Sequence, residues 1–274
     1  MGERPQSIEE SAVEESAVEE VLTRGTLELT GRLVAASNAS FVGTVELDGR
    51  ALSCIYKPVA GERPLWDFPG GTLAGRERAA RMVSEAAGWR VVPATVLRDG
   101  PFGAGMVQHW VDVVAERTLV DVVPPQDVPA GWLSVLEAED GDGRTVRLVH
   151  ADDARLRTMS VFDVVVNNAD RKGGHVLYAG SGAVWGCDHG VCFHTEPKLR
   201  TVLWGWAEQA LRDQDRDSVA RLLQALEDGL DETLAELLSR PERDALRRRA
   251  AGLVAAGRMP SPTGRWPVIP WPAF

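Results

Sequence analysis

Two short apolar segments joined by Asp48-Gly49 constrain the fold of this chain most strongly. Residues 41–47 (FVGTVEL) and 51–57 (ALSCIYK) have the composition of β-strands. Asp-Gly between two such runs is the strongest short-range signal for a two-residue hairpin. Pro58 ends the second strand, because proline has no N–H to donate to a sheet. The pattern predicts an antiparallel hairpin that presents Lys57 at the end of a strand.

The segments after this hairpin alternate between strand and helix at first and become mainly helical later. Apolar spacing and turn residues mark each of them. The predicted elements are a helix over 72–87, strands over 89–97 and 106–114, a loop-rich stretch over 115–151 with a hairpin around 141–143, a helix that is capped by Asp152-Asp153 and ends in Asn167-Asn168, a hairpin of strands 175–179 and 183–187, and mainly helical structure over 202–257. This order predicts an α+β fold whose first unit closes near residue 111.

The composition excludes several classes of protein. The 274 residues carry a net charge of −10, which argues against binding to nucleic acid or to an anionic membrane. The chain starts without a basic and apolar leader, and no apolar run reaches the length of a membrane span. Its three cysteines do not suggest a disulfide framework. We therefore expect a cytoplasmic protein.

Lysine is almost absent from the chain, although basic residues are common. Only Lys57, Lys172 and Lys198 stand among 30 basic residues, and the rest are arginine. With abundant Ala, Val and Gly, this bias is typical of a high-GC bacterium. Lysine is a compact point charge, whereas arginine is a planar fork. The remaining lysines are therefore candidates for sites that need a point charge, and Lys57 is the strongest of them.

The two ends of the chain differ in composition from its middle. The N-terminal repeat EESAVEESAVEE spaces its apolar pairs by five residues, which matches neither a helix face nor a heptad. It predicts an acidic, poorly ordered tail over 1–25. From Pro260 onward the chain has five prolines and two tryptophans. This composition predicts an extended strap over 259–274 that packs on the surface.

Residue types needed for phosphoryl transfer from ATP occur in order along the chain. A Ser/Asn/Gly segment precedes Lys57, and Glu77, Asp170 and Asp188 follow it. In such transfer a lysine held by a glutamate contacts the phosphates, one aspartate orients the acceptor, and another holds Mg²⁺. The common phosphate-loop, dinucleotide, hydrolase-elbow and zinc-protease motifs are absent. The order of these residues predicts a phosphotransferase.

Four segments between residues 31 and 194 also carry a family resemblance. They are Ile55-Tyr56-Lys57-Pro58, Arg76-Glu77-Arg78-Ala79-Ala80 with Val92-Pro93-Ala94-Thr95, Val107-Gln108-His109-Trp110-Val111, and Asn168-Ala169-Asp170-Arg171 with Cys187-Asp188-His189-Gly190. The chain resembles the phosphatidylinositol 3- and 4-kinase superfamily, in a compact bacterial version similar to type II 4-kinases and HipA-type kinases. The resemblance implies a bilobal protein-kinase-like fold, with a small β-rich N-lobe over 26–111 and a mainly helical C-lobe over 112–258.

The resemblance further implies a role for each matching residue. Asp170 would be the catalytic aspartate, Lys172 would stabilise charge on the transferring phosphate, and Asp188 would bind Mg²⁺. Glu77 would fix Lys57 on the α-phosphate, although Glu85 is a rival for this place. The other expected ATP contacts are the backbone of Ser37, Asn38, Ala39 and Ser40 over the phosphates, and Gln108, His109, Trp110 and Val111 beside adenine.

One position departs from the family pattern. The family has Asn five residues after the catalytic Asp as a second metal ligand, and this chain has His175. Histidine suits Mn²⁺ or another transition metal better than Mg²⁺. Either Asn167 or Asn168 could supply a ligand oxygen in its place.

The acceptor, the type of reaction and a second kind of metal site stay open at the level of sequence. The acceptor hydroxyl could belong to a protein, a small molecule or a lipid headgroup. The chain could instead be an ATP-binding regulator that transfers no phosphate, or it could transfer a nucleotidyl group. A zinc site would use the nearby cysteines and histidines Cys187, His189, Cys192 and His194, although their spacing is not a standard one.

Overall fold

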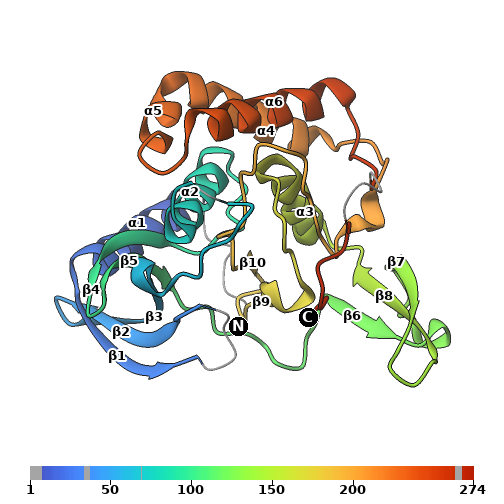
Figure 1. Ribbon diagram of the computed structural model, residues 1–274, viewed down its shortest axis with the longest axis horizontal. Helices are drawn as coiled ribbons and strands as arrows, with labels where there is room; N and C mark the ends of the chain where they lie inside the picture. Colours follow the sequence, from blue (N-terminus) through green and yellow to red (C-terminus); the bar gives the residue numbers. More distant parts are fainter. Residues whose placement is uncertain (1–7, 34–37, 69, 263–266) are drawn as a thin grey trace.

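The computed structural model describes residues 8–33, 38–68, 70–262 and 267–274. Figure 1 shows a β-sheet lobe and a mainly helical lobe side by side. We call them the N-lobe, from α1 to β5, and the C-lobe, from β6 onward. Among the described residues, no helix combines the length and apolar character that crossing a bilayer would require.

The N-lobe is built on a five-stranded antiparallel sheet. Its strand order is β1-β2-β3-β5-β4. The strands are β1 (Thr26–Arg32), β2 (Phe41–Leu47), β3 (Arg50–Pro58), β4 (Thr95–Gly100) and β5 (Gly103–His109). The predicted hairpin is confirmed: Leu47 pairs with Arg50, and both turn residues have positive φ. On β3, Lys57 pairs with Met106 of β5. The predicted strand over 89–97 is shorter than expected, since β4 begins only at Thr95.

Helix α1 (Ile8–Arg24) occupies part of the chain where a poorly ordered tail was expected. The expectation is wrong for these residues because Val18, Val21 and Leu22 are spaced by three and one. That spacing places them on one helix face, where they pack in a buried cluster with Val45 and Tyr56 of the sheet. The five-residue repeat, which spans residues 9–20 and includes Val18, does not show this helix face. Residues 1–7 lie outside the described residues.

Helix α2 (Leu73–Ala86) connects the two lobes, and it confirms the helix predicted over 72–87. Thr72 caps it by accepting a hydrogen bond from the Gly75 N–H at 2.9 Å. The small inner side chains of Ala79, Ala80 and Val83 belong to the main core, which lies largely in the C-lobe. The buried Arg81 also pairs with two glutamates of α1. Helix α2 is therefore held from both sides.

The C-lobe core lies among long helices, seen at the top and centre of Figure 1. The helices are α3 (Ala154–Val166), α4 (Asp213–Ala225), α5 (Asp231–Leu234) and α6 (Arg240–Ala256), and the hairpin strands are β9 (Val176–Tyr178) and β10 (Val184–Gly186). Short helical turns are η1 (Val59–Gly61), η2 (Pro125–Asp127), η3 (Gly173–His175), η4 (Trp204–Trp206) and η5 (Leu226–Leu230). Asp153 caps α3, and Asn167 ends it in the left-handed conformation.

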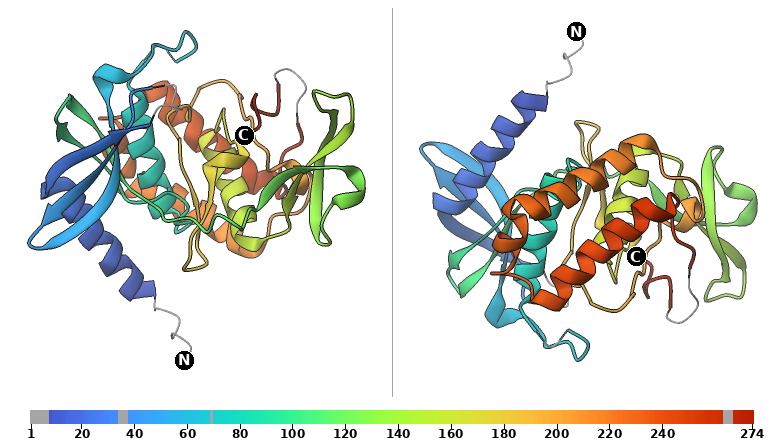
Figure 2. Two further views of the ribbon diagram at one scale, coloured as in Figure 1. Left: turned by 90° about the horizontal axis from the view of Figure 1, so that it is seen from below. Right: turned by 90° about the horizontal axis from the view of Figure 1, so that it is seen from above.

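A separate three-stranded sheet projects from the end of the C-lobe away from the N-lobe (Figure 2). It comprises β6 (Val120–Val123), β7 (Trp132–Glu139) and β8 (Thr145–Ala151) in the order β6-β8-β7. The hairpin expected around residues 141–143 is present between β7 and β8. Strand β6 lies in a stretch expected to be loop, and it forms because it pairs with β8.

The final described residues run along the C-lobe. The Val268 carbonyl accepts hydrogen bonds from the Thr201 N–H at 3.0 Å and from Trp204 Nε1 at 2.8 Å. The Ala273 carbonyl accepts a third, from the Gly173 N–H at 2.8 Å. A side chain at Gly173 would overlap the ring of Phe274. Glycine therefore allows the C-terminal segment to lie against the loop that carries Asp170.

Candidate functional site

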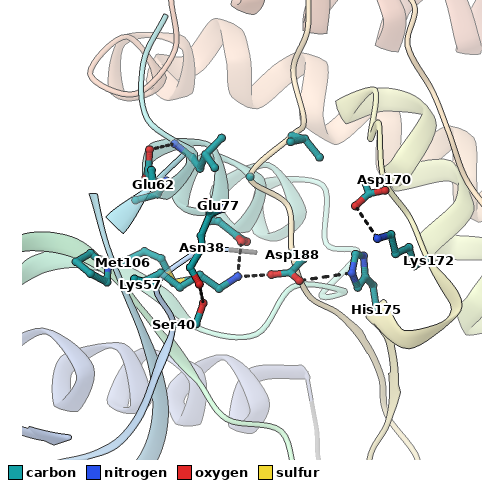
Figure 3. Close-up of a pocket in the computed structure, with 16 residues that line it drawn as sticks. Asn38, Ser40, Lys57, Glu62, Glu77, Met106, Asp170, Lys172, His175 and Asp188 are labelled. Carbon is teal, nitrogen blue, oxygen red and sulfur yellow. Dashed lines mark hydrogen bonds and ion pairs between the residues drawn. The ribbon is translucent and has the colours of Figure 1, made fainter. Parts of the chain in front are cut away.

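A cavity of about 270 Å³ lies between the lobes and gathers charged side chains from both of them (Figure 3). The predicted site residues that line it are Asn38, Ala39, Ser40, Lys57, Glu77, Asp170, Lys172, His175 and Asp188. They come from the segment before β2, from β3 and α2, from the loop after α3 and from the turn after β10. Residues more than 100 positions apart in sequence therefore meet at one place, which we call the Lys57 cavity.

Lys57 and Glu77 form the N-lobe side of this cavity. Lys57 Nζ lies 3.1 Å from Glu77 Oε1, and the Glu77 side chain is only 4% exposed. Burial alone would raise the pKa of Glu77, but the Lys57 charge and the His189 backbone N–H, which donates to Glu77 Oε2 at 2.9 Å, hold it well below its usual range. Glu85 pairs with Arg81 instead and is not among the cavity residues. Of the two rivals, only Glu77 reaches Lys57.

Asp188 faces Lys57 from the C-lobe. Its backbone is in the left-handed region (φ 56°), which an L-residue adopts at a cost. Its carboxylate contacts Lys57 Nζ and lies 3.4 Å from His175 Nε2. Burial opposes ionisation, but Lys57 outweighs it and lowers the pKa of Asp188. A strained turn thus holds a carboxylate in the cavity, and backbone strain of this kind clusters at functional sites.

Asp170 and Lys172 lie on the loop after α3. The Asp170 N–H donates to Asn168 Oδ1 at 3.0 Å, which fixes the start of the loop. Lys172 Nζ lies 3.6 Å from Asp170 Oδ2. Burial raises the pKa of Asp170, the Lys172 charge opposes this, and the Asp188 charge adds to it. Asp170 is therefore a carboxylate with increased proton affinity at the edge of the cavity.

The segment expected to cover phosphates lies partly in place. Asn38, Ala39 and Ser40 line the Lys57 cavity, whereas Ser37 lies outside the described residues. One expected donor is not available, because the Ala39 N–H donates to the Gly61 carbonyl at 3.2 Å. This bond fixes the segment against η1, the turn that follows β3, so its backbone borders the cavity with the Ala39 N–H already paired.

The four residues expected beside adenine are not brought to the Lys57 cavity. The buried Gln108 side chain donates to Thr95 Oγ1 at 2.8 Å. His109, Trp110 and Val111 line a second cavity of about 510 Å³, next to α1. The N–H groups of His109 and Trp110 donate to the carbonyls of Ala94 and Ser53. These two donors are therefore excluded as contacts for a purine ring in the present arrangement.

The residues expected to hold a metal ion, His175 and Asp188, lie next to each other in the Lys57 cavity. Burial lowers the pKa of His175 to about 4, so its ring is neutral near pH 7 and able to act as a ligand. Across the described ranges, no group of three or more His, Cys, Asp or Glu side chains is arranged to hold a metal. A metal that accompanies a nucleotide needs only one or two protein ligands, because phosphate oxygens supply others. The pair fits such a metal.

Neither asparagine expected as a possible oxygen ligand is available. Asn167 Oδ1 accepts a hydrogen bond from the Lys198 N–H, and its amide donates to the carbonyls of His194 and Glu196. Asn168 Oδ1 accepts from the Asp170 N–H. Both side chains are buried and support the surrounding loops. The expectation of an asparagine ligand is wrong.

The third lysine, Lys198, has a structural place between the lobes. Its Nζ lies 3.1 Å from Asp67 Oδ2 and 5.4 Å from the centre of the Trp66 ring. Both partners belong to the N-lobe loop that follows β3, whereas Lys198 follows the Asp188 turn. The contact therefore ties the two lobes together outside the Lys57 cavity.

Sequence reasoning missed several residues that support the site. Glu62 lines the cavity and accepts hydrogen bonds from the first N–H groups of α2, those of Leu73 and Ala74. Asp163 pairs with Arg171, and both side chains are completely buried. A charged residue within the apolar run of α3 was the available signal for Asp163, since an aspartate is almost never fully buried unless it is paired.

Comparisons with solved structures concern the fold of the chain. No family model matches the chain. The crystal structure of the Golgi casein kinase aligns with a TM-score of 0.55 at 12% identity, covering 92% of this chain and 75% of that one. The Helicobacter pylori proinflammatory kinase CtkA aligns with a TM-score of 0.44 at 11% identity, covering 86% and 96%. The first likeness shows that the chain has a bilobal protein-kinase-like fold.

A curated relative is much more similar in sequence. Protein Rv2133c of Mycobacterium tuberculosis is 52% identical over 263 residues, which cover 93% of this chain and 94% of the relative. Identity at this level over nearly the whole length leaves the shared fold and descent in no doubt. The chain therefore belongs to the family of Protein Rv2133c.

Proposed function

We propose that this protein is an ATP-dependent phosphotransferase that moves the γ-phosphate to a hydroxyl acceptor. One observation carries the proposal: the Lys57–Glu77 ion pair of the N-lobe faces Asp188 and Asp170 of the C-lobe across one cavity. A lysine on the third strand paired with a helix glutamate, opposite two loop aspartates, is the arrangement that kinases use. The kinase-like fold supports the proposal.

Each charged side chain has a task in this reaction. Lys57, oriented by Glu77, binds the α-phosphate. Asp170 accepts a hydrogen bond from the acceptor hydroxyl and aligns its oxygen with the γ-phosphorus, and its raised proton affinity suits it to take up the proton. Lys172 then stabilises charge on the transferring phosphoryl group. Asp188 and His175 would hold a Mg²⁺ or Mn²⁺ ion, which supplies neutralisation of the β- and γ-phosphate charge.

The sequence motifs around Lys57, Glu77, Asp170 and Asp188 support a finer proposal, that the protein is similar to phosphatidylinositol 3- and 4-kinases. The acceptor then belongs to one of three classes: a lipid headgroup, a protein or a small molecule. An extract of the host, incubated with the protein and γ-labelled ATP and separated into lipid, protein and small-molecule fractions, identifies the class by where the label appears.

The test of the proposed reaction is label transfer from ATP in the presence of Mg²⁺ or Mn²⁺. We expect label from the γ-position, and not from the α-position, to reach an acceptor, water or the protein itself. The Asp170→Ala variant should still bind ATP, measured as a rise in melting temperature, but transfer almost no label. Asp142→Asn, at the exposed β7–β8 turn, is the control and should transfer label as the wild type does.

A second candidate function has its own supporting observation. His175 stands where the kinases that the sequence resembles have a metal-binding Asn. The Ala39 N–H, expected to contact phosphate, is already paired. The site therefore lacks two groups that a kinase of this type would use. Such a protein would bind ATP as a regulator. ATP binding without label transfer to any acceptor would support the regulator and contradict the kinase. Label transferred from the α-position would instead support nucleotidyl transfer.

A further inference from the structure

His189 lies directly behind the Lys57 cavity and has no role in the proposed reaction. It follows Asp188 in the chain, and its side chain is completely buried. Phe162 of α3 packs edge-on against its ring, with 5.4 Å between ring centres. The polar edges of the ring face two charged groups, Glu77 on one side and Arg171 on the other.

The contact with Arg171 determines which ring nitrogen of His189 lacks a proton. Arg171 Nη2 lies 2.7 Å from His189 Nε2. A guanidinium group has only donors, so Nε2 must be the acceptor of this hydrogen bond. The guanidinium is fixed in turn by Asp163, at 2.9 Å from both Nε and Nη2. The ring therefore meets a rigid donor and cannot carry a proton at Nε2.

The other ring nitrogen, Nδ1, is buried and has no hydrogen-bond partner among the described residues. The proton of the neutral ring then lies at Nδ1, which is 3.7 Å from Glu77 Oε2. The backbone N–H of His189 donates to the same oxygen at 2.9 Å. Glu77 Oε1, the other oxygen, faces Lys57. His189 thus donates its backbone N–H to the glutamate that holds the lysine, and its Nδ1 faces the same oxygen from beyond hydrogen-bond distance.

The chain of contacts continues to the loop of Asp170. Asp163 accepts a hydrogen bond from Asn168 Nδ2 at 3.0 Å, and Asn168 Oδ1 accepts one from the Asp170 N–H at 3.0 Å. Arg171 also donates to the carbonyl of Cys187, next to Asp188. A buried polar network therefore extends from Glu77 in the N-lobe to Asp170 in the C-lobe. His189 connects its two halves, through its backbone N–H to Glu77 and through its ring Nε2 to Arg171.

We propose that His189 is a positioning residue, protonated at Nδ1 only, which ties the Lys57–Glu77 pair to the loop of Asp170 through Arg171. It touches no substrate. It sets the distance between the groups that bind phosphate and the group that orients the acceptor. Its effect on catalysis rests on the proposed function, whereas its protonation state does not.

The protonation state is tested by nitrogen NMR of protein labelled with ¹⁵N-histidine. The chain has five histidines, so the spectrum is simple. We expect His189 to show a protonated Nδ1 and an unprotonated Nε2 at neutral pH, with or without ATP. A proton at Nε2, or on both nitrogens, would overturn the proposal. The His189→Gln variant assigns the signal; if it does not fold, single substitutions of the other four histidines assign it by elimination.

The positioning role is tested by comparing His189→Gln with His189→Leu. Glutamine keeps an oxygen that accepts from Arg171, whereas leucine keeps only the volume. We expect kcat to fall about 100-fold for leucine and about tenfold for glutamine, since small displacements of catalytic groups cost this much. The KM for ATP and the folded fraction at assay temperature should stay close to the wild type. Equal losses in both variants, or losses that follow the unfolded fraction, would contradict the role.

The two tests separate two kinds of failure. If the wild type transfers no phosphate, the proposed function fails, and the NMR result still decides the protonation state of His189. If the wild type is active but Nε2 carries the proton, the proposed function stands and the inference about His189 is wrong.

Discussion

The Lys57 cavity and the segment of His109, Trp110 and Val111 differ in how their polar groups are arranged. At the Lys57 end, charged side chains from both lobes face one cavity, and most of them have an oppositely charged partner there. At the end formed by His109, Trp110 and Val111, the backbone donors of the first two are paired within the N-lobe, and the residues face α1. The comparison teaches that the side chains proposed to bind phosphate are gathered at one cavity, whereas the backbone expected to bind adenine has two of its donors already paired.

The largest expected effect is at the phosphate end. Lys57→Met should reduce label transfer about 100-fold or more, because one preorganised group that stabilises the transition state is worth this much. It should also lower the free energy of unfolding by about 3 kcal/mol, since Glu77 stays buried without its partner. Rates and denaturant unfolding measure the two effects.

A double variant and a matched control sharpen this prediction. The Lys57→Met, Glu77→Met protein should recover most of the lost stability without recovering activity, because no unpaired charge is left buried. Arg147→Met is the control, since its ion pair with Glu137 joins two strands but is exposed. A double variant no more stable than Lys57→Met alone would contradict the role given to burial.

A smaller effect is expected for the choice of metal ion. His175→Asn replaces a nitrogen ligand with an oxygen, and oxygen ligands favour Mg²⁺ over Mn²⁺. We expect the ratio of activity with Mg²⁺ to activity with Mn²⁺ to rise about tenfold, within the range for altered metal environments. An unchanged ratio in metal titrations would show that His175 does not contact the ion.

A still smaller effect, on the affinity for ATP, is expected at Trp110. Trp110→Ala should change the dissociation constant for ATP less than about threefold, which is below 1 kcal/mol, because Trp110 does not line the Lys57 cavity. Calorimetric titration measures it. An affinity for ATP about 100-fold weaker in the variant would contradict the comparison and would indicate that adenine binds against this backbone.

The smallest expected effect concerns the stability contributed by Asp170. Its folded-state pKa is raised, so the native protein binds this proton more tightly than the unfolded chain does. The ionised carboxylate therefore destabilises the native state above the folded-state pKa, and this cost disappears as pH falls through that value. Asp170→Asn should raise the melting temperature slightly at neutral pH and not at low pH. A lower melting temperature at neutral pH would contradict the sign.

Local patterns in the sequence predicted much of the fold. The Asp-Gly hairpin and the helix of Glu77 form where their own residues favour them. Helix α1 and strand β6 were missed because each is stabilised by a partner distant in sequence, the N-lobe sheet for α1 and β8 for β6. Tertiary contacts of this kind leave little trace in a local window.

The charged side chains of the site were predictable from the sequence, whereas its backbone contacts were not. Lys57, Glu77, Asp170 and Asp188 could be chosen because their types and order match one chemistry, and the structure brings them together. The pairing of the Ala39 N–H and the placement of Trp110 could not, since backbone hydrogen bonds depend on sheet register and loop packing. The link through His189 depends on its burial between two lobes, which no local pattern encodes.

Calorimetric titration of the full-length protein with ATP and Mn²⁺ tests the central claim most directly, that the Lys57 cavity holds the triphosphate. The account predicts saturable binding by the wild type and its loss in the Lys57→Met, Glu77→Met protein, shown to be folded by its melting transition. Binding of equal strength in the two proteins, or none by the wild type, would contradict the account.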